Sequence, residues 1–214
     1  KDWKSKNTRR TITKPMSHVV ANSSDYIIAE ADNGNIMMFD RKGKVRLEIR
    51  KSFVNALGSD IYANRTNSKG MMITTNSEGK LIYIPEKGKV RSSDFGDFSQ
   101  DHFFMYNDFT GNGNYDFIYL DGSKLQVFDR LKKPVLTYVF ENKIQNKPKI
   151  FTLAGRKVLA VLDDIVWQLY LFNFDVLIHQ NLHGNGDYII DVSRNGNAFV
   201  LIGKDKSLMK YPLK

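Results

Sequence analysis

The sequence predicts an all-β fold in which one unit of roughly 40–45 residues recurs five times. The first observation is a repeated hairpin, in which an apolar residue is followed three positions later by an aromatic or aliphatic one. The pairs are Ile36 and Phe39, Leu81 and Ile84, Leu125 and Phe128, Trp167 and Tyr170, and Leu208 and Tyr211. The first members are 45, 44, 42 and 41 residues apart. This period is typical of the blades of a β-propeller, each of which is a four-stranded antiparallel sheet.

Two further observations support the same class. No apolar period of 3.6 residues persists for three turns, so almost no α-helix is expected. The composition of 42% apolar residues, with 14 Phe and 10 Tyr, suits the packing of sheets on one another. A single blade cannot bury its own faces, so the repeat itself implies a stack of neighbouring sheets.

The elements of the first unit show the pattern that the other units repeat. Its strands are expected at 18–21, 26–31, 36–39 and 45–49, and Asn33-Gly34 marks a hairpin turn because both central residues need positive φ. Strands in the other units are expected at 60–63, 71–75, 81–84 and 90–92; 103–107, 117–120, 125–128 and 135–140; 149–153, 158–162, 166–172 and 176–179; and 188–192, 198–202 and 208–211. The units cover residues 17–50, 57–95, 102–140, 147–181 and 187–214.

The fifth unit has only three expected strands, whereas a short alternating piece at 11–13 has no unit of its own. Closed propellers commonly share one blade between the two chain ends, which removes an exposed sheet edge. We therefore expect residues 8–15 to complete the last blade, so that residues 1–214 form one five-bladed domain. The alternative is that the chain is a piece of a longer propeller.

One loop carries the strongest chemical signal. Residues 108–116 read D-F-T-G-N-G-N-Y-D, with oxygen-bearing side chains at loop positions 1, 3, 5 and 9 and a glycine at position 6. This alternation is how a short loop wraps a hard cation with oxygen ligands.

The loop resembles the calcium-binding loop of the FG-GAP (VCBS-type) propeller repeat, over nine residues and the strand that follows. The resemblance implies a Ca²⁺ site with the ligands Asp108, Thr110, Asn112, Asn114 (through its backbone carbonyl) and Asp116. Thr110 and Asn112 depart from the more acidic family pattern, and two carboxylates alone imply low affinity. The alternative is a metal-free turn held by side-chain hydrogen bonds to the backbone. A fainter copy at 181–189 lacks both terminal acids and is interpreted as the turn without the metal.

Other constellations are interpreted as structural. Asp163 and Asp164 fall at a hairpin turn, and His179 and His183 lie at a strand end and in a loop, without the glutamate of a zinc-protease motif. No nucleophile elbow, P-loop or dinucleotide fingerprint occurs. A glycoside hydrolase would need carboxylates that converge from separate blades, for which the candidates are Asp60, Asp101 and Asp191.

Charge and composition narrow the class of partner. The net charge is +9, of which residues 1–14 carry five, and a basic end of this kind is more often a solvated arm than a nucleic-acid site. No run of about 18 apolar residues would span a membrane. The chain has no cysteine, which excludes a disulfide framework and thiolate metal sites.

The sequence thus favours a non-catalytic binding or scaffolding module, with a protein or glycan partner and a monomeric state. The FG-GAP resemblance implies an extracytoplasmic location, in the periplasm or at the cell surface. The alternative is a carbohydrate-binding or glycoside hydrolase-like propeller that uses its central funnel. A second alternative is a regulatory domain that contacts nucleic acid through the basic arm.

Overall fold

The computed structural model describes residues 10–12, 15–50, 57–64, 71–87, 89–153, 155–173, 176–184, 187–193 and 195–213. The chain divides into two compact units, residues 1–106 and 107–214, and each is described by itself. Most of the predicted basic arm lies outside the described residues. Within the described ranges all regular structure is β-strand, in agreement with the predicted fold class.

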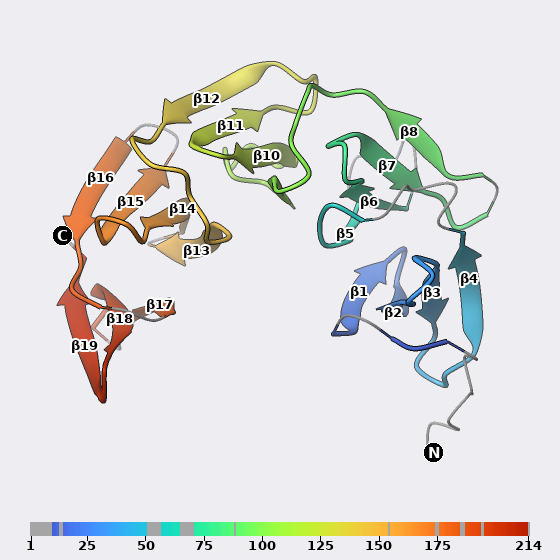
Figure 1. The fold of residues 1–214 in the computed structure, drawn as a ribbon, viewed down its shortest axis with the longest axis horizontal. Helices are drawn as coiled ribbons and strands as arrows, with labels where there is room; N and C mark the ends of the chain where they lie inside the picture. Colours follow the sequence, from blue (N-terminus) through green and yellow to red (C-terminus); the bar gives the residue numbers. More distant parts are fainter. Residues whose placement is uncertain are drawn as a thin grey trace. The chain divides into compact units, whose positions relative to one another are not determined.

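The described residues among 15–93 of unit 1 form two four-stranded sheets with the orders β1-β2-β3-β4 and β5-β6-β7-β8. Successive strands are antiparallel and adjacent, so each sheet is a simple meander (Figure 1). The strand bounds are β1 Ser17–Ala21, β2 Ser24–Glu30, β3 Ile36–Phe39, β4 Val45–Ile49, β5 Tyr62–Ala63, β6 Met72–Thr75, β7 Leu81–Ile84 and β8 Arg91–Ser93.

The remaining strands form two four-stranded sheets, β12-β11-β10-β9 and β13-β14-β15-β16, and one three-stranded sheet, β17-β18-β19. The boundary between the two units falls inside β9. The bounds are β9 Phe103–Asn107, β10 Asp116–Asp121, β11 Lys124–Phe128, β12 Pro134–Val139, β13 Lys149–Leu153, β14 Arg156–Asp163, β15 Gln168–Asn173, β16 Val176–Asn181, β17 Tyr188–Val192, β18 Ala198–Lys204 and β19 Ser207–Pro212.

The hairpins between the second and third strands explain why the repeat is regular. In the first three sheets this hairpin contains a glycine with positive φ: Gly34 at 76°, Gly79 at 76° and Gly122 at 59°. A residue without a Cβ enters this backbone region without steric penalty, so glycine sets the turn and hence the register.

Apolar cores lie between neighbouring sheets within each unit. In unit 1, Ile36 and Met38 of β3 belong to one buried cluster with Met72 of β6 and Ile84 of β7. In unit 2, a second cluster joins Leu162 and Leu169 of the fourth sheet to Val200 and Ile202 of the fifth. This is the burial that the repeat requires, since each sheet supplies one face to its neighbour.

Aromatic rings fill the corresponding space between the third and fourth sheets. Phe140, which is 3% exposed, lies edge-on to Tyr170 with ring centroids 4.9 Å apart, and Tyr138 lies 5.2 Å from Phe172. Edge-to-face pairs at these distances add to the free energy gained from burial alone. Burial raises the pKa of Tyr170 above its usual range, because the phenolate would lose its hydration.

Two outer strands carry irregularities at matching places. The register between β3 and β4 shifts between Met38 and Phe39, and the register between β11 and β12 shifts between Val127 and Phe128. Both shifts precede a turn that begins with an aspartate, Asp40 or Asp129.

The segment predicted to close the last blade pairs in unit 1 where it is described. Ile12 forms an antiparallel bridge with Ala31, and the N–H of Asp32 donates to the carbonyl of Thr11 at 2.8 Å. The pairing of residues 8–15 with the last blade, the blade number and the single-domain organisation stay predictions.

The fourth hairpin differs from the sequence expectation. A strand was expected at 166–172, but β15 begins at Gln168, because residues 164–167 form a four-residue turn between the paired Asp163 and Gln168. The repeat position of Trp167 is therefore in a turn. Leu208, which occupies the same repeat position in the fifth unit, lies in β19, but its side chain is 67% exposed.

Candidate functional site

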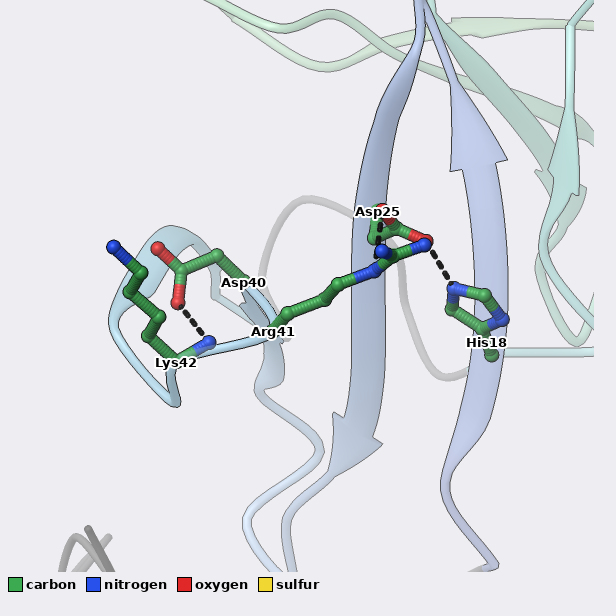
Figure 2. Close-up of polar contacts among 5 residues, drawn as sticks. All are labelled: His18, Asp25, Asp40, Arg41 and Lys42. Carbon is green, nitrogen blue, oxygen red and sulfur yellow. Dashed lines mark hydrogen bonds and ion pairs between the residues drawn. The ribbon is translucent and has the colours of Figure 1, made fainter. Parts of the chain in front are cut away.

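Aspartates at hairpin turns form a recurring hydrogen-bond motif. Asp40 Oδ1 accepts the N–H group of Lys42 at 2.8 Å (Figure 2). It also accepts the N–H group of Lys44 at 2.9 Å. These bonds, led by that from Lys44, hold the pKa of Asp40 below its ordinary value. The same arrangement recurs at Asp129 with Leu131 and Lys133, and at Asn76 with Glu78 and Lys80.

Asp163 follows the same rule, as predicted from its place in the repeat. Its Oδ1 accepts the N–H of Ile165 at 3.1 Å, and its Oδ2 accepts the side-chain amide of Asn142 at 3.0 Å. Asp163 is fully buried, so its carboxylate serves the turn and has no access to a substrate.

Asp25 holds the first blade's outer hairpin to its first two strands. Its carboxylate accepts from Nε2 of His18 at 2.7 Å and pairs with Nε of Arg41 at 2.7 Å (Figure 2). The hydrogen bond with His18 and the guanidinium of Arg41 lower the pKa of Asp25. His18 and Arg41 are more than half exposed, so this pair of contacts is a surface network and contributes modestly to stability.

The acidic loop at 108–116 is folded by bonds from its own backbone. Oδ2 of Asp116 accepts both the N–H (2.8 Å) and the hydroxyl (3.0 Å) of Thr110, and Oδ2 of Asp108 accepts the N–H of Gly113 at 3.0 Å. Asn112 Oδ1 accepts the N–H of Asn114 at 2.8 Å. Gly111 and Gly113 have φ of 72° and 82°, which a side chain would disfavour.

Two carboxylate oxygens in this loop take no part in these hydrogen bonds. Oδ1 of Asp108 and Oδ1 of Asp116 are both buried and have no hydrogen-bond partner. Burial, and to a smaller extent the neighbouring charge of Asp108, raises the pKa of the fully buried Asp116. Buried carboxylate oxygens without donors are the ligands that a hard cation satisfies, so the donor set fits calcium. Across the described ranges no group of three His, Cys, Asp or Glu residues gathers, so any such site has only two carboxylates.

A hollow of about 420 Å³ lies beside the loop in unit 2. One wall is formed by residues 108–111 and the other by the turn and first residues of β14. The lining residues are Asp108, Phe109, Thr110, Gly111, Gly155, Arg156, Lys157 and Asn173. Arg156 is exposed, and Lys157 Nζ donates to Thr152 Oγ1 at 3.0 Å. The site therefore combines the acidic loop with two cationic side chains that no sequence motif had indicated.

The fainter loop copy at 181–189 is built differently. Asp187 Oδ1 accepts from Lys149 Nζ at 2.6 Å, and the same ammonium group lies 4.1 Å from the centre of the Tyr188 ring. Lys149 lowers the pKa of Asp187. The acid of this copy is thus neutralised by a lysine from β13; Asn185 and Gly186 lie outside the described residues.

The three acids considered for hydrolysis are exposed in their own units. Asp60 precedes β5, Asp101 precedes β9 and Asp191 lies in β17. Asp191 Oδ1 accepts the N–H of Val192 at 2.8 Å. Their convergence stays a prediction.

Trp167 is a feature that the sequence interpretation missed. Its φ is 53°, in the left-handed region that costs a residue with a side chain about 1–2 kcal/mol. It lines a second hollow in unit 2, of about 380 Å³, with residues from the end of β16, the following loop and the end of β18. The available signal was the absence of glycine from residues 163–168, since the same hairpin of each of the first three sheets contains one.

The comparisons with known proteins identify the fold class. No protein-family model matches the chain, and no curated protein matches its sequence. Solved structures of β-propellers do match, and with the sheets described above they assign the chain to the β-propeller class of all-β folds.

Three structures illustrate the match. The chain is similar to the Dos1 propeller (12% identity, 88% of this chain, 55% of that chain, TM-score 0.54). It is similar to BamB from Moraxella catarrhalis, with 12% identity over 95% of this chain and 63% of that chain and a TM-score of 0.56. It is also similar to virginiamycin B lyase from Staphylococcus aureus, with 12% identity over 92% of this chain and 69% of that chain and a TM-score of 0.56. The chain thus spans less than two thirds of the Dos1 and BamB chains. No helix in the described residues has the length and hydropathy to cross a membrane.

Proposed function

We propose that the protein is a non-catalytic, extracytoplasmic binding module, whose contact surface includes the hollow between the acidic loop and β14. The observation that carries this proposal is the set of groups around that hollow: Asp108 and Thr110 on one wall, Arg156 and Lys157 on the other. Its volume is within the range of small-molecule sites, and its charged groups suit orientation of a ligand. The extracytoplasmic location is supported only by the resemblance of the loop to the FG-GAP repeat.

Calcium belongs to this proposal. Asp108 and Asp116 would hold Ca²⁺ through their unpartnered oxygens, together with Thr110, Asn112 and the backbone carbonyl of Asn114. Bound calcium would neutralise Asp116 and also Asp108, the one carboxylate that lines the hollow. Arg156 and Lys157 would then set the sign of the local charge, which favours a ligand or partner that carries carboxylate groups.

The turn motif supports the non-catalytic part of the proposal. Asp40, Asp129 and Asp163 accept backbone N–H groups in equivalent structural roles. Oxygens that accept hydrogen bonds within a turn serve the fold, and these acids therefore need no catalytic role to explain their positions.

The binding test uses immobilised polyglutamate and polygalacturonate as carboxylate-bearing probes, with calcium present. We expect saturable, salt-sensitive binding that is lost in the double variant Arg156→Gln, Lys157→Gln. The matched control is Arg130→Gln, Lys133→Gln, which removes the same charge from an exposed turn of the same unit. Equal loss in both double variants, or no binding by the parent protein, would contradict a site at this hollow.

The catalysis test uses a broad panel of glycosides and esters. We expect no turnover. If the protein does turn over a substrate, and Asp60→Ala, Asp101→Ala or Asp191→Ala abolishes that activity, the alternative carbohydrate-active function is correct.

Ring closure is also proposed, with five blades and residues 8–15 as the last strand. The four sheets of four strands and the one of three that the described residues form support this count. Small-angle scattering tests it, because a closed 214-residue domain should have a radius of gyration of about 17 Å. A clearly larger value for the monomer would indicate an open array.

A further inference from the structure

We propose a second binding site, for a neutral carbohydrate, at the hollow lined by Trp167. It is distinct from the hollow beside the acidic loop and goes beyond the function proposed above. The lining residues are Val166, Trp167, Gln168, Asn181, Leu182, His183, Gly184 and Lys204. All belong to unit 2, and all lie within the described residues.

The first argument is the position of the tryptophan. The equivalent hairpins of the first three sheets have glycine at positive φ, and that of the fifth has Asp205, a residue type that tolerates this region. A bulky aromatic residue at this position is a genuine outlier, and such outliers cluster at ligand sites. The turn would form more readily with glycine, so the indole has a use other than forming the turn.

The second argument is that the indole is supported. Trp167 packs against the buried cluster that includes Leu169 and Leu182, and its carbonyl accepts the N–H of Leu182 at 2.7 Å. Trp167 is partly buried and is also one of the residues that line the hollow. A fixed indole face is the surface on which the apolar C–H face of a sugar ring stacks.

The third argument is that the opposite wall is held in place. Tyr211 both donates its hydroxyl to the carbonyl of His183 at 3.1 Å and accepts the N–H of His183 at 3.0 Å. At Gly184 a Cβ would lie 2.6 Å from the Ile202 side chain, so the loop approaches β18 more closely than a larger residue permits. The hollow therefore has two anchored walls.

The fourth argument is the chemistry of the rim. Asn181, His183 and Lys204 are exposed and offer an amide, an imidazole and an ammonium group for hydroxyl hydrogen bonds. No carboxylate and no arginine lines the hollow, so a doubly charged anion such as a phosphate has only one permanent cation to pair with. An aromatic platform with a polar rim and a volume of about 380 Å³ suits one or two sugar units.

The experiment begins with an array of neutral oligosaccharides of glucose, mannose and N-acetylglucosamine, beside sulfated and sialylated glycans and nucleotides. The chain has two tryptophans, so Trp3→Phe leaves Trp167 as the sole indole. We expect a saturable change in its fluorescence with the neutral oligosaccharides selected on the array. If no neutral oligosaccharide gives such a change at millimolar concentration, or only anionic ligands do, the proposal is wrong.

Variants locate the site. Trp167→Gly should fold, because glycine relieves the positive φ, and should weaken binding about tenfold or more. Asn181→Ala, which leaves the turn intact, should weaken binding several-fold. Ile165→Ala is the matched control, since this exposed residue of the same turn does not line the hollow, and its affinity should be unchanged. Unchanged affinity in both Trp167→Gly and Asn181→Ala would overturn the proposal.

The two proposed binding sites can be tested independently of each other. Binding of the neutral oligosaccharide should persist in the Arg156→Gln, Lys157→Gln variant and in the presence of a calcium chelator. Loss of binding under either condition would place the sugar at the acidic loop instead of at Trp167.

Discussion

Thr110 donates both its backbone N–H and its hydroxyl to one oxygen of Asp116, and the other oxygen of that buried carboxylate has no partner. One oxygen of the carboxylate thus shapes the loop, and the other is buried and accepts no hydrogen bond. The physical consequences of this division can be measured in the metal-free and the calcium-loaded protein.

Calcium should stabilise the fold. At a concentration about 100 times its dissociation constant, a bound ion adds roughly 2.7 kcal/mol to the free energy of unfolding. Thermal melting in millimolar calcium should therefore occur at a higher temperature than in chelator, and Asp108→Asn should abolish the difference. Asp94→Asn is the control, since its side chain is 89% exposed in unit 1. Identical melting of the parent protein under both conditions would leave only the metal-free turn.

Without calcium, Asp116 should make stability fall as pH rises. Its folded-state pKa lies above the ordinary 3.8, so between those two values the folded state binds more protons than the unfolded state. The free energy of unfolding then decreases as pH increases through that window. Urea unfolding in chelator at a series of pH values should show this decrease, and Asp116→Asn should remove it. An unchanged profile in the variant would contradict the burial-driven shift.

Asp25 should affect the pH dependence of stability in the opposite direction to Asp116. Its pKa lies below 3.8 in the folded state, so its contribution is present above that value and is lost as pH falls through the lowered pKa. Asp25→Asn should therefore reduce the loss of stability in acid. The same urea series measures it, and Arg41→Gln should give a smaller effect of the same sign, since His18 supplies the larger cause.

Two glycines separate backbone strain from steric overlap. Gly122 has positive φ and open space around a Cβ, so Gly122→Ala should cost about 1–2 kcal/mol. Gly79 has similar φ, but a Cβ there would lie 2.5 Å from Phe98, and overpacking adds about 1–3 kcal/mol. Chemical denaturation of both variants should rank Gly79→Ala as the more destabilised. The reverse order would show that Phe98 moves aside easily.

Neighbouring residues at the end of the third sheet give a matched test of the aromatic cluster. Phe140→Ala should lower the free energy of unfolding by about 3–5 kcal/mol, because it leaves a cavity among Tyr138, Tyr170 and Phe172. Val139→Ala, at a side chain that is 63% exposed, should change it by less than about 0.5 kcal/mol. Similar losses in both variants would mean that the cluster contributes little.

Hairpins with glycine turns were predictable from the sequence. The third strands of the first two units, Ile36–Phe39 and Leu81–Ile84, have the bounds expected from the repeat, because a glycine at positive φ fixes where each turn ends. The fourth hairpin was placed wrongly because Trp167 occupies that backbone region itself. From the sequence alone, a bulky apolar residue next to a strand is assigned to that strand.

The candidate site was predictable only in part. The loop at 108–116 is continuous in sequence, so its oxygen ligands could be proposed from spacing alone. Arg156 and Lys157 follow the loop by 40 residues or more, on another sheet, and carry no motif. Only the packing of two sheets in unit 2 brings them to the same hollow as Asp108.

The register shifts at Met38/Phe39 and Val127/Phe128 bear on how copies of the protein behave at high concentration. Each shift lies where a sheet meets its outermost strand, β4 or β12, whose far side is left without a further strand in its own sheet. An irregular register increases local twist, and a twisted edge is a poor template for the addition of a strand from another molecule. Pro134, at the start of β12, has no backbone N–H to donate to an added strand. These features predict resistance to ordered aggregation at the edges of the first and third sheets.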